Sequence, residues 1–169
     1  MDVQIRPFHA DDLEEIVQVS LLAWEPVFRS FRQVLGSTIF SLQYPDWRAS
    51  QQSVVETICR NQEQFSTWVA ERAASVVGFV VCQLNLHDQI GEVELLAVHP
   101  EHQNQGIGSL LNKVALQHMR EHGMQLAVVG TGGDPGHAPA RAAYEKAGYT
   151  PLPLVRYYQA LIDQQSEYS

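Results

Sequence analysis

Two glycines in the middle of the chain, Gly106 and Gly108, carry the clearest chemical signal. They follow an apolar run that ends at Pro100 and a short polar loop, and they open an amphipathic run that continues to about His122. A strand-to-helix junction of this kind leaves backbone N–H groups unpaired at the positive end of a helix dipole. Glycine leaves room for a ligand to reach those groups. The segment therefore predicts a phosphate-binding site.

Two better-known phosphate motifs are excluded by the same residues. Leu111 stands where a dinucleotide-binding fingerprint needs its third glycine, and no Gly-Lys-Ser/Thr sequence occurs in the chain. The glycines alone are equally compatible with a plain strand–helix turn, so the assignment depends on the surrounding sequence.

Two carboxylates precede this junction. Glu92 and Glu94 lie two residues apart in an apolar run, so their side chains share one face of a predicted strand. Burial would raise the pKa of such a carboxyl and suit it to act as a base near neutral pH. A solvated strand end is the alternative, and it fits Glu92 beside Gly91 better than it fits Glu94.

No metal site is predicted. His118 and His122 lie four residues apart, but no glutamate follows His118 as in His-Glu-x-x-His, and no third ligand is evident. His118 continues an apolar helical stripe and is expected to pack in the core. Cys59 and Cys82 are expected to be reduced core thiols.

The elements that position these residues alternate along the chain. Strands are expected over 3–7, 67–72, 75–84, 92–98, 125–129 and 154–162. Helices are expected from Asp11 or Asp12 to about Trp24, over 51–61, over 106–122 and from Pro139 to Gly148, with a broken helix and a loop within 25–50. This order predicts an α/β fold, a mixed sheet with helices on both faces, in a single domain over 1–169.

Composition narrows the function. The net charge of −8 over 169 residues argues against nucleic acid as a partner and permits a cationic substrate such as an amine. No apolar run is long enough to span a membrane, and residues 1–5 lack the features of a signal peptide. We therefore expect a cytoplasmic protein without a membrane partner.

Residues 92–111 resemble the pyrophosphate-binding motif of the GNAT acetyltransferase superfamily, Gln/Arg-x-x-Gly-x-Gly/Ala, here Gln103, Gly106 and Gly108. Residues 140–149, Ala-Arg-Ala-Ala-Tyr-Glu-Lys-Ala-Gly-Tyr, are similar to a late helix of the same family. The resemblance is strong over 92–149 and rests on pattern alone over 1–66. It implies a single GNAT domain with a mostly antiparallel mixed sheet, splayed central strands and an acetyl-CoA-binding core at about 67–149.

The resemblance also implies a reaction, in which acetyl-CoA donates its acetyl group directly to a primary amine. In the family, the strand before the phosphate loop carries a bulge and splays from the next strand, and pantetheine lies in the gap. The residues implied to contact acetyl-CoA are Leu96, Ala97, Val98, Gln103, Asn104, Gln105, Gly106, Ile107, Gly108, Ser109, His137, Ala140 and Tyr144.

Roles in the transfer follow from the same resemblance. Tyr144 matches a tyrosine that protonates the leaving thiolate, although packing of an amphipathic helix is its alternative role. Glu94 or Glu92 would take the proton of the amine through water. A backbone N–H near Leu96 or Ala97 would stabilise the oxyanion. His137 stands where the family usually has asparagine, so it is a cofactor contact, a second base or a plain loop residue.

The acceptor is expected to be a small-molecule amine, because the chain is acidic and small. A peptide or protein amine is the main alternative, and a non-catalytic acyl-CoA-binding sensor is the alternative of another class. Five aromatic residues could line the acceptor site or pack beneath an irregular segment: Trp24, Phe28, Phe31, Tyr44 and Trp47. Members of the family often dimerise through their last strands, so a homodimer is possible.

Overall fold

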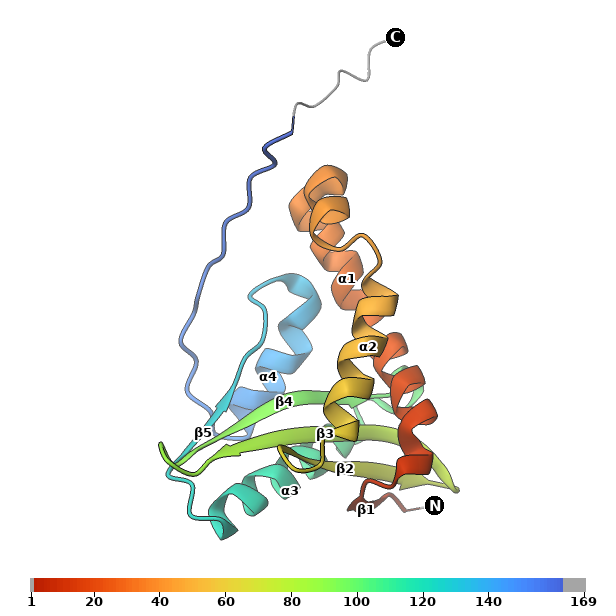
Figure 1. Ribbon diagram of the computed structural model, residues 1–169, viewed down its shortest axis with the longest axis vertical. Helices are drawn as coiled ribbons and strands as arrows, with labels where there is room; N and C mark the ends of the chain where they lie inside the picture. The colour runs from red at the N-terminus through yellow and green to blue at the C-terminus, as the bar shows by residue number, and fades with distance from the viewer. Residues whose placement is uncertain (1, 163–169) are drawn as a thin grey trace.

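The computed structural model describes residues 2–162, and a five-stranded sheet forms its centre (Figure 1). The strands lie side by side in chain order: β1 (Gln4–Pro7), β2 (Phe65–Arg72), β3 (Ser75–Asn85), β4 (Ile90–Val98) and β5 (Leu126–Val129). Neighbouring strands are antiparallel except β4 and β5, which are parallel. The helices are α1 (Leu13–Gln43), α2 (Trp47–Arg60), α3 (Ile107–Glu121) and α4 (Ala138–Lys146). Three short 3-10 turns accompany them: η1 (Ala10–Asp12), η2 (Pro100–His102) and η3 (Pro135–His137).

Helices cover both faces of the sheet, as the sequence predicts (Figure 1). On one face α1 and α2 pack around Ile16, Val55 and Phe79, and on the other α3 packs Ile107 and Leu111 against the sheet. The centre of β3 is buried on both sides from residue 76 to residue 82. Because both faces of β3 are covered, its sequence is a continuous apolar run without polar alternation.

The first helix differs from the prediction. A helix ending near Trp24 is wrong, since α1 continues through Pro26 to Gln43. The predicted break lies at Gly36, whose φ of 75° interrupts the helix. Proline removes one backbone hydrogen bond from a helix. Downstream, Phe28 stacks on Trp47 of α2 and contacts the ring of Tyr44, and such tertiary packing outweighs a local cost of this kind.

The predicted final strand is also wrong. Residues 154–162 form no strand and extend away from the sheet beyond α4 (Figure 1). Pro151 and Pro153 have no N–H to donate to a ladder, and within the described residues β5 pairs with β4 alone. The apolar pattern that suggested a strand remains, but the side chains are exposed, with Leu154 at 81% and Tyr157 at 90%.

Other expectations about single residues hold. Cys59 and Cys82 are buried and free. His118 packs against Trp68, with ring centroids 4.8 Å apart, and burial lowers the pKa of its imidazole. No helix in the described part of the chain is both long and apolar enough to cross a membrane.

Candidate active site

A cleft opens where two neighbouring strands separate. β5 follows β4 only from the pair Ile90 and Leu126 to the pair Val93 and Val129, and β4 then continues alone to Val98. The space between the strands becomes a cavity of about 500 Å³, closed by the start of α3, by α4 and by part of α1. This geometry confirms the predicted splay of the central strands.

A β-bulge lies at the point where the strands separate. Val81 of β3 is paired with Leu95, whereas the next residue, Cys82, is paired with Val93, so Glu94 is left without a partner in the ladder. An extra residue in one strand redirects its side chain. Glu94 is half-buried and lines the cleft.

Glu92 and Glu94 have different surroundings although they share a face of β4. Val93, between them, is buried in the core beside α3, so both glutamates lie on the opposite face. Glu92 is exposed and is not among the residues lining the cleft. Burial raises the pKa of Glu94, and the negative charge of Glu92 raises it further. The geometry therefore favours Glu94 over Glu92 as a base.

The start of α3 presents its free backbone donors to the cleft. Gly106 is the N-cap residue with a φ of 83°, a conformation that favours glycine, and no side chain caps the first turn. The Gln103 side chain donates to the Val98 carbonyl at 3.0 Å and so braces the loop against β4. Ile107 is 1% exposed and its side chain lies in the core. Its backbone is then the part available to a ligand.

Most residues that the sequence predicts as cofactor contacts come together around this cleft. Those lining it are Leu96, Ala97, Val98, Gln103, Asn104, Ile107, Gly108, His137, Ala140 and Tyr144. Gln105, Gly106 and Ser109 do not line it. The Gln105 side chain instead accepts a hydrogen bond from Arg72 at 2.6 Å.

Tyr144 reaches the cleft from α4 and is half-buried. Burial, and to a smaller extent the neighbouring Tyr149, raises the pKa of Tyr144 to about 12. The two rings meet edge to face with their centroids 5.7 Å apart. At neutral pH the Tyr144 hydroxyl therefore carries its proton, as an acid must.

The sequence did not reveal a polar cluster beside His137. Asp134 accepts a hydrogen bond from Ser30 Oγ at 2.6 Å and is also hydrogen-bonded to His137 Nδ1. Ser30 in turn accepts from the Gly136 N–H at 3.0 Å. Burial opposes ionisation of Asp134, but the hydrogen bonds from Ser30 and His137 outweigh it and lower the pKa of this carboxyl. Ser30 lies in the segment expected to be irregular, so no periodic signal marked it.

This cluster joins α1 to the loop before α4. A Cβ added at Gly136 would collide with Ser30 Cβ at 2.6 Å, so glycine is required for the close approach. The Arg141 side chain donates to the carbonyls of Gly132 at 2.6 Å and Asp134 at 2.7 Å and fixes the loop from the other side. His137, with Nδ1 held by Asp134, thus faces the cleft from a braced position.

The fold, the cleft and the sequence motif define one family. The model of the acetyltransferase (GNAT) family matches residues 32–149. The chain belongs to this family, which confirms the predicted assignment to the N-acetyltransferases, a family of acyltransferases.

Curated relatives match part of the chain. A mycothiol acetyltransferase of Streptomyces bingchenggensis (strain BCW-1) is 32% identical over 83 residues, which cover 49% of this chain and 26% of that protein. One of Thermomonospora curvata is 31% identical over 93 residues, covering 55% of this chain and 30% of that protein. The match thus spans less than a third of the length of these relatives.

Solved structures share the fold at low sequence identity. The PaiA N-acetyltransferase of Thermoplasma acidophilum in complex with coenzyme A superposes with a TM-score of 0.68 at 19% identity, covering 89% of this chain and 91% of that one. The ribosomal-protein-S18-alanine N-acetyltransferase of Escherichia coli superposes with a TM-score of 0.65 at 18% identity, covering 95% of this chain and 86% of that one. The aminoglycoside 6'-N-acetyltransferase AAC(6')-IG of Acinetobacter haemolyticus superposes with a TM-score of 0.66 at 14% identity, covering 95% of this chain and 99% of that one.

Proposed function

We propose that the chain binds acetyl-CoA in the cleft between β4 and β5 and transfers the acetyl group directly to a primary amine of a small molecule. The observation that carries this proposal is the cleft itself. It has uncapped helix donors at one end, and it brings Glu94 and Tyr144 to the same cavity.

The donor set suits acetyl-CoA. The pyrophosphate would lie on the backbone N–H groups between Gln103 and Ser109, which no side chain of the first turn of α3 occupies. The pantetheine arm would run beside Leu96, Ala97 and Val98, whose free edge faces the gap left by β5. Gly108 lines the path between these two parts.

The transfer needs three groups. Glu94 takes a proton from the ammonium form of the acceptor, directly or through water, and the freed nitrogen attacks the thioester carbon. The oxyanion that forms accepts a hydrogen bond from a backbone N–H near Leu96 or Ala97. The C–S bond then breaks, Tyr144 gives its proton to the departing thiolate, and the tyrosinate takes, through water, the second proton that the nitrogen loses as it becomes an amide. His137, held by Asp134, is the second candidate for the base.

The relatives support a small-molecule acceptor. The curated matches are named for mycothiol acetylation, and one structural relative is a complex with a bisubstrate analogue of an aminoglycoside. A protein amine is the second candidate, supported by the shared fold of the S18-alanine enzyme. A sensor that binds acyl-CoA without turnover is the candidate of another class.

The test is coenzyme A release from acetyl-CoA with polyamines, aminoglycosides, amino acids and short peptides. We expect turnover on one class of acceptor and a loss of about 30-fold in kcat for Tyr144→Phe, since an acid of this kind contributes about 10²- to 10⁴-fold and water replaces part of it. Tyr149→Phe is the matched control, because the Tyr149 ring contacts the Tyr144 ring edge to face but does not line the cleft. Its rate should stay within about twofold of wild type.

Calorimetry separates the alternatives. Saturable acetyl-CoA binding without turnover on any acceptor would favour the sensor. Absence of binding would refute the proposal, and equal losses in the two tyrosine variants would remove Tyr144 as the acid.

We also propose that the chain acts as a homodimer in the cytoplasm. Support comes from the side of the molecule around β5 and α4, neither of which contains a fully buried residue. Leu126 and Val128 of β5 are 54% and 37% exposed. Residues 150–162 of a second copy have the apolar character to cover this edge.

A further inference from the structure

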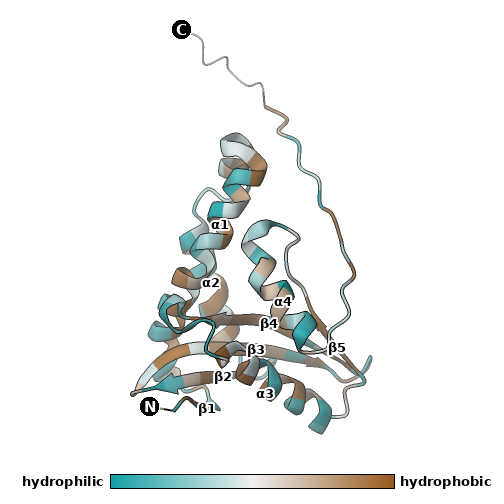
Figure 2. Ribbon diagram, turned by 180° about the vertical axis from the view of Figure 1, so that it is seen from behind, coloured by the Kyte–Doolittle hydropathy of each residue, from teal (hydrophilic) through white to brown (hydrophobic). Residues whose placement is uncertain are grey.

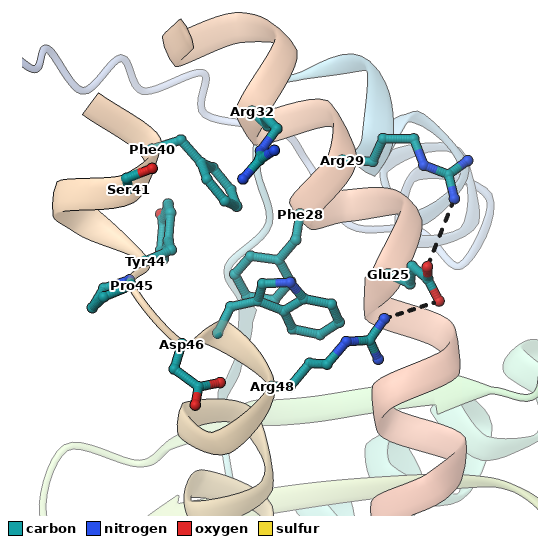
Figure 3. Close-up of a pocket in the computed structure, with 11 residues that line it drawn as sticks. Glu25, Phe28, Arg29, Arg32, Phe40, Ser41, Tyr44, Pro45, Asp46 and Arg48 are labelled. Carbon is teal, nitrogen blue, oxygen red and sulfur yellow. Dashed lines mark ion pairs between the residues drawn. The ribbon is translucent and has the colours of Figure 1, made fainter. Parts of the chain in front are cut away.

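A second cavity, of about 350 Å³, lies between the later half of α1 and the start of α2 (Figure 3). It shares no lining residue with the cleft between β4 and β5. The acetyl-transfer chemistry proposed above uses none of its side chains. The cavity therefore needs its own explanation.

Aromatic rings form the apolar part of this cavity. Phe28 and Trp47 are stacked with centroids 4.3 Å apart and an angle of 15° between their planes. Tyr44 meets Phe28 edge to face at 5.4 Å. All three side chains are half-buried and line the cavity. Arg48 lies over the Trp47 ring at 4.5 Å. Rings that only joined α1 to α2 would be expected to close this space, whereas these leave a hollow beside them.

The charged part of the cavity is cationic. Arg29, Arg32 and Arg48 line it together with Glu25 and Asp46, and three guanidinium groups against two carboxylates leave one net positive charge. The whole chain has a net charge of −8. A cationic hollow on an acidic protein attracts anions that the rest of the surface repels.

The two carboxylates are already engaged. Glu25 is shared between Arg48 at 3.4 Å and Arg29 at 3.9 Å, as Figure 3 shows. Asp46 accepts a hydrogen bond from the Ala49 N–H at 3.1 Å and so caps α2. Arg32 lies over the Phe40 ring at 4.9 Å and makes no ion pair with any carboxylate in the described part of the chain. Its guanidinium is the group left to receive a ligand.

We propose that this cavity is a binding site for a ring-bearing organic carboxylate. The ring packs beside Phe28 and Trp47, and the carboxylate accepts two hydrogen bonds from the Arg32 fork, a geometry that guanidinium favours. The ring and carboxylate belong either to the acceptor amine itself or to a separate ligand. Binding at this site does not require the proposed acetyl transfer, because none of the lining residues takes part in the transfer chemistry.

Calorimetric titration with benzoate and benzylamine tests the site, since the two probes share a ring and differ in charge. We expect saturable benzoate binding that weakens at least about fivefold in Arg32→Gln, a loss of about 1 kcal/mol. Benzylamine should bind at least about tenfold more weakly than benzoate. Arg60→Gln is the matched control, because Arg60 lies on α2, pairs with Glu56 and does not line the cavity.

Three results would overturn the site: equal affinity for the two probes, unchanged benzoate affinity in Arg32→Gln, or no saturable benzoate binding up to about 20 mM. Thermal unfolding of both variants shows that they are folded.

A further titration with 4-(aminomethyl)benzoate and acetyl-CoA identifies the source of the carboxylate. Coenzyme A release that falls in Arg32→Gln assigns it to the acceptor, and binding without release assigns it to a separate ligand. Failure of acetyl-CoA binding itself would refute the proposed function and leave the benzoate result valid.

Discussion

At the scale of single residues, the bulge separates two glutamates that look equivalent in the sequence. It leaves Glu94 outside the β3–β4 ladder and within the cleft, whereas Glu92 is exposed. The charge of Glu92 nevertheless contributes to the raised pKa of Glu94. One glutamate is thus the candidate base, and the other adjusts the pH at which that base is ionised.

Substitution of each glutamate separates these roles. Glu94→Gln should lower kcat by about 100-fold, the lower end of what a general base contributes. Glu92→Gln removes a negative charge beside Glu94, so the pKa of Glu94 falls and the acidic limb of the kcat/KM profile moves to lower pH. Rate profiles against pH measure both effects. A Glu94→Gln variant with wild-type rates would contradict the assignment of Glu94 as the base. An acidic limb of the kcat/KM profile that moves to higher pH in Glu92→Gln would contradict the proposed effect of Glu92 on Glu94.

His137 shows why part of the site could not be predicted. The motif gave its position but not its partners, because Ser30 and Asp134 lie 104 residues apart in sequence and meet only in the folded chain. The positions of the loop before α3 and of Tyr144 at the cleft were predictable, because a contiguous motif carries each of them. The cluster around Asp134 depends on long-range contacts, which a single sequence does not encode locally.

At the scale of elements, the same distinction applies to the fold. Five of the six predicted strands, all but the one over 154–162, and α3 are found within about two residues of their expected ends, because each has one clear periodicity. The path of α1 was not predicted, since Pro26 and Gly36 are local breakers and aromatic contacts with α2 compensate for them. The tertiary packing of this helix outweighs its local signals.

A polar clamp at the β1–α1 junction provides a stability prediction. Asp12 is 6% exposed, and its two carboxylate oxygens accept hydrogen bonds from Arg6 at 2.8 Å. It also accepts from the His9 N–H at 2.7 Å. Asp12→Asn should lower the free energy of unfolding by about 2 kcal/mol, because charge-assisted bonds of a buried group are lost. Asp11→Asn is the control, since Asp11 is the exposed neighbour.

The pH dependence of this difference has a defined sign. The hydrogen bond from Arg6 holds the pKa of Asp12 below its ordinary value, with burial opposing it. The ionised Asp12 carboxylate therefore contributes its full stabilisation at pH values above the ordinary pKa of aspartate. This contribution is lost as the pH falls through the lowered pKa of Asp12 in the folded protein. Urea unfolding at several pH values should show the gap between wild type and Asp12→Asn narrowing below about pH 4. A gap that widens in acid would contradict the clamp.

At the scale of the whole molecule, the most exposed large apolar side chains in the described part of the chain lie in the segment after α4. Figure 2 shows hydrophobic stretches along the extended segment after α4, where Leu152, Leu154 and Leu161 are 81%, 81% and 90% exposed. The neighbouring edge of β5 has no partner strand within the described residues. Exposed apolar groups beside an open strand edge favour association. This pairing of features supports the proposed homodimer.

Truncation tests the dimer directly. Light scattering after gel filtration should give twice the chain mass for the given chain and one chain mass for a version ending at Tyr149, because the proposed dimer uses residues 150–162 to cover β5 of the other copy. Leu154→Asp places a charge in that interface and should weaken dimerisation by at least about tenfold. Gln159→Asp, in the same segment but already polar, should leave it within about twofold. A monomeric full-length chain would contradict the proposal, and so would a dimer that survives the truncation. The truncated chain should also unfold at lower temperature, since its β5 edge and α4 lose their only proposed cover.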